Sequence, residues 1–181
     1  MSEHTPVCVP SRPSSIQEFL DLRDQIATTP EGGAAMMIVA LLAFTEDQVL
    51  GRQCLACAVG SSRLVDGTQG YGGLQLTNAS LAQIGTQILG REHLPRSYVV
   101  GTEPDGGYVL GNPPYEINCL RNPHSGDPDS GRCKVFVLSS GADSPRPVTV
   151  VVNDEGIWKA IEWSSLLVGV RPPRQGARRE L

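Results

Sequence analysis

The chain has 181 residues, 40% of them hydrophobic, with 20 glycines and 14 prolines. This composition favours one compact domain with many turns over a coiled coil or a disordered chain. The formal net charge of −4 gives no general attraction to nucleic acid or to an anionic membrane. The longest apolar run, residues 34–44, is far shorter than the ~20 residues that a membrane span needs. We therefore expect neither nucleic acid nor a membrane as a partner.

The five cysteines lack the regular spacing of a disulfide framework. The first residues have neither the basic start nor the apolar run of a signal peptide. Both observations predict a reducing, cytoplasmic location. No sequence motif indicates a cofactor.

Residues 1–13 are polar and rich in proline, which predicts an N-terminal arm. A helix is expected to begin at Ser14 or Ser15, because Ser15 and Glu18 have the spacing of a capping box. Its stripe at helical spacing consists of Ile16, Phe19, Leu20, Arg23 and Ile26.

A second helix is expected to begin after Thr29, since Pro30 suits the first helical position and Glu31 suits the positive end of the dipole. Residues 34–44 are apolar on every side, so this helix should be the central buried one. Thr45 and Gln48 predict a capping box for a third helix that runs to about residue 59. A long glycine-rich loop at 60–76 and a fourth helix from about 77 to 90 follow.

The period of the hydrophobic pattern changes after Pro95. The strand candidates are residues 98–100, 108–110, 115–120, 133–138 and 148–152. Helices followed by strands indicate an α+β fold, with about four N-terminal helices packed on a mostly antiparallel C-terminal sheet of about five strands. The predicted organisation is a single domain at 14–172, with a helical half at 14–92 and a β-rich half at 96–172, and a basic tail at 173–181.

Residues 153–156, Asn-Asp-Glu-Gly, have the chemistry of a type I turn followed by a left-handed glycine. This three-residue hairpin loop sets Asn153 opposite Ile157 and Val152 opposite Trp158. The expected core face carries Val148, Val150, Val152, Trp158 and Ala160. The opposite face carries Thr149, Val151, Lys159, Ile161 and Trp163. That second face is too apolar to be simply solvated, so another part of the chain or a partner should cover it.

Four segments carry a resemblance to a known family. TPEGGAAMM (29–37), GYVLGNPPYEI (107–117), NPHSGDPDSGRCKVFVLSSGADSPRPV (122–148) and GIWKAIEWSSLLVGVRPP (156–173) resemble a bacterial family of uncharacterised proteins, a domain of unknown function. The resemblance extends over nearly the whole chain except the first dozen residues and the tail. It implies one discrete bacterial domain and assigns no catalytic residue.

Cys54 and Cys57 form a C-x-x-C pair, the pattern of a redox-active thiol pair or of half a zinc site. The pair lies within a predicted helix and on its apolar stripe, which favours buried structural thiols. Asp127 and Asp129 are weak metal candidates, because an EF-hand loop would need an acidic residue where Leu138 stands.

The leading hypothesis is a non-enzymatic protein-interaction or assembly module that binds a partner or a second copy through the second face of the sheet. Its candidate binding residues are Lys159, Ile161, Trp163, Arg121 and His124. One alternative is a hydrolase or metal-dependent enzyme that uses the 121–132 loop with His124, Asp127 and Asp129. Another is a thiol redox protein that uses the C-x-x-C pair.

Overall fold

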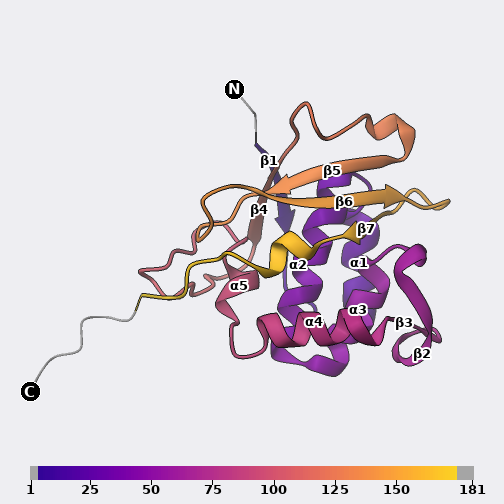
Figure 1. Ribbon diagram of the computed structural model, residues 1–181, viewed down its shortest axis with the longest axis horizontal. Coiled ribbons are helices and arrows are strands. Elements are labelled where there is room, and N and C mark those ends of the chain that lie inside the picture. Colours follow the sequence, from indigo (N-terminus) through magenta and orange to yellow (C-terminus); the bar gives the residue numbers. More distant parts are fainter. Residues whose placement is uncertain (1–3, 175–181) are drawn as a thin grey trace, which may run out of the picture.

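A computed structural model describes residues 4–174 and has the α+β fold expected from the sequence (Figure 1). Its helices are α1 (Ile16–Ile26), α2 (Pro30–Glu46), α3 (Gln48–Ala58), α4 (Asn78–Ile88) and the short α5 (His93–Arg96). The main sheet contains β1 (Thr5–Val9), β4 (Tyr115–Leu120), β5 (Arg132–Val137), β6 (Arg146–Val152) and β7 (Trp158–Glu162), in the order β1-β4-β5-β6-β7. Every pair of neighbouring strands is antiparallel. None of the helices within residues 4–174 is long and apolar enough to cross a membrane.

Side-chain caps determine where the first three helices begin. The Ser15 hydroxyl accepts from the Glu18 amide and Thr29 accepts from the Gly32 amide, both at 3.1 Å. The predicted cap of α3 at Thr45 is wrong, because α2 continues through Thr45 to Glu46. The carboxylate of Asp47 caps α3 instead and accepts from the amides of residues 49 and 50 at 3.0 and 3.1 Å.

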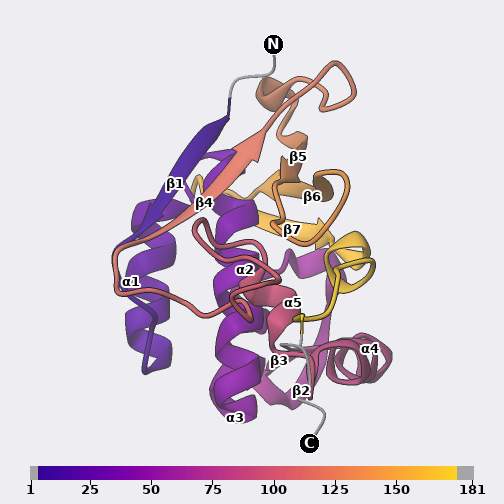
Figure 2. The ribbon, with the colours of Figure 1, turned by 90° about the vertical axis from the view of Figure 1, so that its left-hand side faces the viewer.

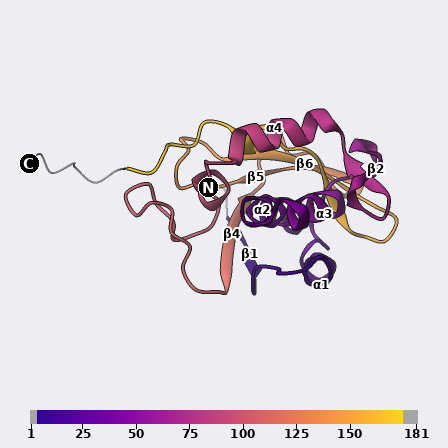
Figure 3. The same ribbon diagram turned by 90° about the horizontal axis from the view of Figure 1, so that it is seen from below.

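Helix α2 is the central element, as its sequence predicts. All its residues from Pro30 to Phe44 are buried, and it packs against all five strands of the sheet and against α1, α3 and α5. Figures 2 and 3 show it in the centre, with α1 on one side and α4 on the other. Gly33 permits close contact with the sheet, because a Cβ atom there would lie 2.7 Å from the Trp158 Cβ.

The predicted turn at residues 153–156 and its register are confirmed. Val152 pairs with Trp158, the Asn153 amide donates to the Ile157 carbonyl at 2.9 Å, and Gly156 has a φ of 79°. Of the expected core face, Val152 alone is only half-buried. The ladder shifts register between residues 149 and 150. The shift leaves Ile161 without a direct partner on β6.

The N-terminal segment is not the polar arm that its composition predicts. Residues 5–9 form β1, an edge strand paired with β4, with Val7 and Val9 buried. Pro6 lacks an amide proton, which an edge strand tolerates because one of its sides has no partner strand. The alternation of Val7 and Val9 was the signal for this strand.

Residues 60–76 were expected to form a loop but contain a hairpin, β2 (Leu64–Tyr71) and β3 (Leu74–Leu76). Gly72 and Gly73 connect the strands and both have positive φ, at 63° and 81°. A two-residue hairpin turn with positive φ at both positions is typical of Gly-Gly. We call this element the β2–β3 hairpin.

The strands predicted at 98–100 and 108–110 are absent from the described part of the chain. The amides of Tyr98 and Val99 bond back to residues 95 and 96 in turns that follow α5. Tyr108 has a φ of 56°, which is incompatible with an extended strand. Both tyrosine rings are buried, and their hydroxyls donate to the carbonyls of residues 166 and 171.

The chain is tied to the domain on both sides of residue 173, where the predicted basic tail begins. Arg171, just before the tail, pairs with Asp143 at 2.5 Å, and Arg174 within it pairs with Asp105 at 3.3 Å. The tail's remaining residues, 175–181, lie outside the described part.

The contact between α2 and β7 predicts the effect of a helical Gly→Ala substitution. Such a change ordinarily stabilises a helix by about 0.5–1 kcal/mol. Gly33→Ala should instead destabilise the fold by about 1–3 kcal/mol, because its methyl group overlaps the Trp158 backbone and Cβ. Urea unfolding measures both effects. Gly85→Ala in α4 is the matched control and should be stabilising, since its Cβ meets only Leu89 at 3.7 Å. A Gly33→Ala variant as stable as the wild type would contradict this packing.

Candidate functional site

A groove of about 510 Å³ opens between the β2–β3 hairpin and the main domain. We call it the hairpin groove. Its walls come from α1, the end of α3, the β2–β3 hairpin, and β6 with β7. The side chains that line it are mostly apolar and include Leu20, Leu64, Tyr71, Leu74 and Val151. A largely apolar cavity of this size with a few polar groups has the usual properties of a ligand site.

Two cations lie at one end of α3 and line the groove. Lys159 Nζ donates to the Cys57 carbonyl at 2.7 Å, and Arg23 Nη1 donates to the same oxygen at 3.2 Å. Both cap the negative end of the helix dipole and satisfy a carbonyl in its last turn. Arg23 also pairs with Asp24 at 3.0 Å.

Lys159 differs from Arg23 because no carboxylate within residues 4–174 forms an ion pair with it. Its ammonium group has three donors, and one of them is used by Cys57. Burial lowers the pKa of Lys159, and the nearby Arg23 charge lowers it further. The groove therefore has mostly apolar walls and one half-buried cation without an ion-pair partner in residues 4–174.

Sequence reasoning placed Lys159 among the candidates but missed Arg23, Tyr71 and Leu74. Arg23 was recognisable as a cation on the otherwise apolar stripe of α1. Tyr71 and Leu74 flank the Gly-Gly turn, which predicts a hairpin but was interpreted as part of a loop.

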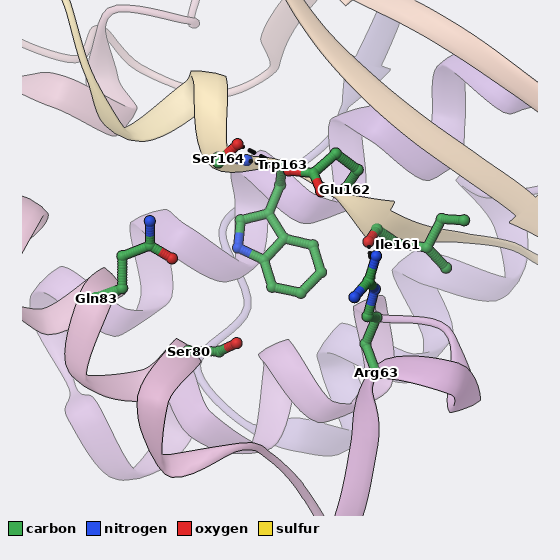
Figure 4. A pocket seen from close by; sticks show the side chains of 7 residues that line it. All are labelled: Arg63, Ser80, Gln83, Ile161, Glu162, Trp163 and Ser164. Atoms are coloured by element: carbon green, nitrogen blue, oxygen red, sulfur yellow. Dashed lines mark hydrogen bonds between the residues drawn. The ribbon is translucent and has the colours of Figure 1, made fainter.

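Trp163 is covered by its own chain, which is one of the two alternatives that the sequence left open for this face. It is 6% exposed and Ile161 is 8% exposed. Figure 4 shows the Trp163 indole between Gln83 and Ser80 of α4 and Arg63, around a cavity of about 110 Å³. Arg63 Nε donates to the Ile161 carbonyl at 2.8 Å. Both apolar side chains are therefore buried by contacts within the chain.

Arg121 holds a buried carboxylate in place. Its Nε lies 2.6 Å from Glu31 Oε1, and its Nη2 donates to Oε2 at 2.9 Å. Glu31 is 6% exposed and belongs to the first turn of α2. The hydrogen bond with Glu31 raises the pKa of Arg121. This bidentate pair joins the end of β4 to α2. The guanidinium of Arg121, a candidate binding group, thus makes its contact within the fold.

His124, Asp127 and Asp129 are exposed on the loop between β4 and β5. The His124 amide donates to the Asn122 side chain at 2.8 Å. The Asp127 carboxylate accepts from the Asp129 amide at 2.9 Å and caps a short 3₁₀ turn, Pro128–Ser130. Within residues 4–174, no group of three or more His, Cys, Asp or Glu side chains is placed to hold a metal ion.

The C-x-x-C pair lies in α3, and both thiols are buried and free. Burial raises the pKa of Cys54 to about 12 and also raises the pKa of Cys57. Raised pKa values leave little thiolate, the form that attacks disulfides. This geometry favours a packing role for the pair.

Residues 11–174 match the family described as Domain of unknown function (DUF6935), and the chain belongs to this family. No curated protein and no solved structure matches it. The resemblance to an uncharacterised family is therefore confirmed.

The state of the thiols predicts an alkylation pattern. At pH 8 iodoacetamide should modify the exposed Cys8 and leave Cys54, Cys57, Cys119 and Cys133 unmodified in the folded protein. The reason is that burial both blocks access and raises the pKa of these four thiols. Peptide mass mapping with and without urea measures the pattern. Native labelling of Cys54 or Cys57 as fast as Cys8 would restore the redox hypothesis.

The burial of Trp163 predicts a loss of stability rather than a selective loss of binding. Trp163→Ala should lower the free energy of unfolding by about 3–5 kcal/mol, since a buried indole is removed from the core. Urea unfolding followed by far-ultraviolet circular dichroism measures the change. Val109→Ala, at a side chain that is 69% exposed, is the control and should change stability by less than about 0.5 kcal/mol. Equal effects in the two variants would mean that Trp163 is not a core residue.

Proposed function

We propose that the protein is a non-enzymatic interaction module whose hairpin groove binds a segment of a partner protein. The segment would carry an acidic side chain flanked by apolar residues. The proposal rests on Lys159, because it is a half-buried cation without an ion-pair partner within residues 4–174 and it lines a mostly apolar groove. A carboxylate from a partner would engage its unused donors in a charge-assisted hydrogen bond.

The exposed apolar residues of the β2–β3 hairpin support a protein partner. Val65 is 42% exposed, Tyr71 is 42% exposed and Leu74 is 39% exposed, and all three belong to this one element. Clustered exposed apolar side chains mark interaction surfaces more often than isolated ones do. A tyrosine next to a leucine at the rim of a groove offers area that apolar side chains of a partner would cover.

The surroundings of Lys159 favour an acidic partner over a basic one. Arg23 lies beside the same Cys57 carbonyl and adds a second positive charge at this end of the groove. Asp24 balances Arg23 through their ion pair. Glu155 and Asp24 also lie close enough to act on the charge of Lys159, but neither forms an ion pair with it within residues 4–174. Its ammonium group therefore still favours a carboxylate over a basic segment.

We also propose that the module works in the bacterial cytoplasm. All five cysteines are free thiols, which suits a reducing compartment. The bacterial setting rests on the resemblance of the four sequence segments quoted above.

The test selects peptides from a random phage-displayed library against the immobilised protein. Selected peptides should contain Asp or Glu within a few residues of Leu, Ile or Phe, and calorimetry of synthetic copies gives their Kd. Lys159→Met should weaken binding by roughly tenfold or more, the effect of losing a hydrogen bond to a charged group. Tyr71→Ser combined with Leu74→Ser should weaken it by a similar factor.

Two controls separate the groove from general effects of charge and apolarity. Arg91→Met removes an exposed cation from another part of the surface, and Val100→Ser combined with Val109→Ser removes exposed apolar side chains elsewhere. Both variants should bind like the wild type. Peptides that bind wild type and Lys159→Met equally, or a library that yields no binder, would refute the proposal.

A further inference from the structure

A second cavity, of about 320 Å³, lies where the loop between β4 and β5 folds against the outer surface of the sheet. It is separate from the hairpin groove, since the two share no lining residue. We call it the basic cavity. The residues that line it are His124, Ser125, Gly126, Ser130, Arg132, Lys134 and Thr149. Three of these seven residues are basic, three carry a hydroxyl group and none carries a carboxylate.

The cations of the basic cavity lack counter-ions. Arg132 and Lys134 form no ion pair with any residue in 4–174, although the chain has 19 acidic residues and only 15 lysines and arginines. Five other arginines in the same range do pair with carboxylates. Two neighbouring cations repel each other unless an anion lies between them. An anion bound in this cavity would offset that repulsion.

Strand register brings the donors together. Lys134 of β5 is the direct cross-strand partner of Thr149 of β6, so the two side chains project from the same face of the sheet. Arg132 is two residues before Lys134 and shares that face. Thr149 is 7% exposed, and its hydroxyl takes part in no hydrogen bond within the described residues. Thr149 lines the cavity, so this hydroxyl is available there as a donor.

The loop that carries His124 is held by its own hydrogen bonds. The Lys134 amide donates to the Ser125 carbonyl at 2.9 Å, which ties the loop to β5. The amide of Asn122 donates to the Ser125 hydroxyl at 3.0 Å, and the Asn122 side chain accepts from the His124 amide. These bonds fix the backbone on either side of the imidazole. The cavity wall is therefore built before any ligand arrives.

None of the acidic residues in positions 4–174 lines the cavity. Glu162 of β7 is the register partner of Thr149 but accepts two hydrogen bonds from Ser164, at 3.1 and 2.8 Å. Asp127 accepts from the Asp129 amide, and neither aspartate lines the cavity. The sequence suggested a metal cation on this loop, whereas the residues that line the cavity favour an anion.

We propose that the basic cavity binds a phosphate group, either as the free ion or as a monoester. A phosphate dianion has several strong acceptor oxygens, and arginine binds two of them at once. Lys134 would supply a point charge, Thr149 a hydroxyl donor and His124 a ring nitrogen donor. A carboxylate has only two oxygens and would leave some of these donors unused. The site is independent of the hairpin groove and of its proposed peptide.

The test titrates the full-length protein with sodium phosphate at constant ionic strength and follows backbone amide shifts by NMR. Saturable shifts should appear at residues 124–134 and at Thr149. Arg132→Met and Lys134→Met should each raise the Kd by roughly tenfold or more. Both side chains are exposed, so the variants should keep the wild-type fold, which the rest of the spectrum reports.

A control variant and a second probe make the result specific. Arg91→Met removes an exposed cation outside the cavity and should bind phosphate like the wild type. Because phosphate binding is measured without a peptide, failure of this site and failure of the groove are distinguishable. O-phosphoserine is titrated in parallel, and tighter binding of either probe supports the site and identifies the free ion or the monoester as its ligand. Shifts that do not saturate, or equal Kd values in wild type, Arg132→Met and Lys134→Met, would overturn the proposal.

Discussion

The burial of α2 from Pro30 to Phe44 is the constraint on which the rest of the structure depends. A helix that is apolar on every side cannot face water, so other elements must enclose it. The sheet covers one side, and α1, α3 and α5 cover others. Gly33 allows β7 to approach so closely that a Cβ atom at position 33 would overlap Trp158. The one ionised group at the start of this helix, Glu31, is balanced by the bidentate contact with Arg121.

Because the inner face of the sheet packs against α2, charged side chains such as Arg132 and Lys159 lie on the outer face. Arg132 pairs with Val151, and Val151 pairs with Lys159, so these three residues form a row across β5, β6 and β7. Arg132 lines the basic cavity, while Val151 and Lys159 line the hairpin groove. The two proposed anion sites thus lie side by side on a chain whose net charge is negative. Their location follows from the register of the strands rather than from the overall charge.

The burial of Trp163 shows why alternation along a strand is an incomplete guide to function. Alternation placed Trp163 beside Lys159 and Ile161 on a face that needed a cover. The register shift near Ile161 sets Glu162 opposite Thr149. Residues of α4, in the same chain, lie beside Trp163. Arg121 was another plausible binding residue, and its guanidinium is engaged by a carboxylate from a distant helix. In both cases a side chain suited to an interface makes its contact within the fold.

Local patterns were enough to predict the α+β class, the buried helix, the caps at Ser15 and Thr29, and the register set by the turn at Asn153. Each of these depends on residues within a few positions of one another, where backbone geometry and side-chain capping decide the outcome. The edge strand β1, the cover over Trp163 and the hairpin groove depend on the tertiary structure. Arg23 and Lys159 are far apart in the sequence and meet at one carbonyl only because α1 and β7 both pack against the end of α3. No periodicity in the sequence predicts this contact, since it arises from the packing of whole elements around α2.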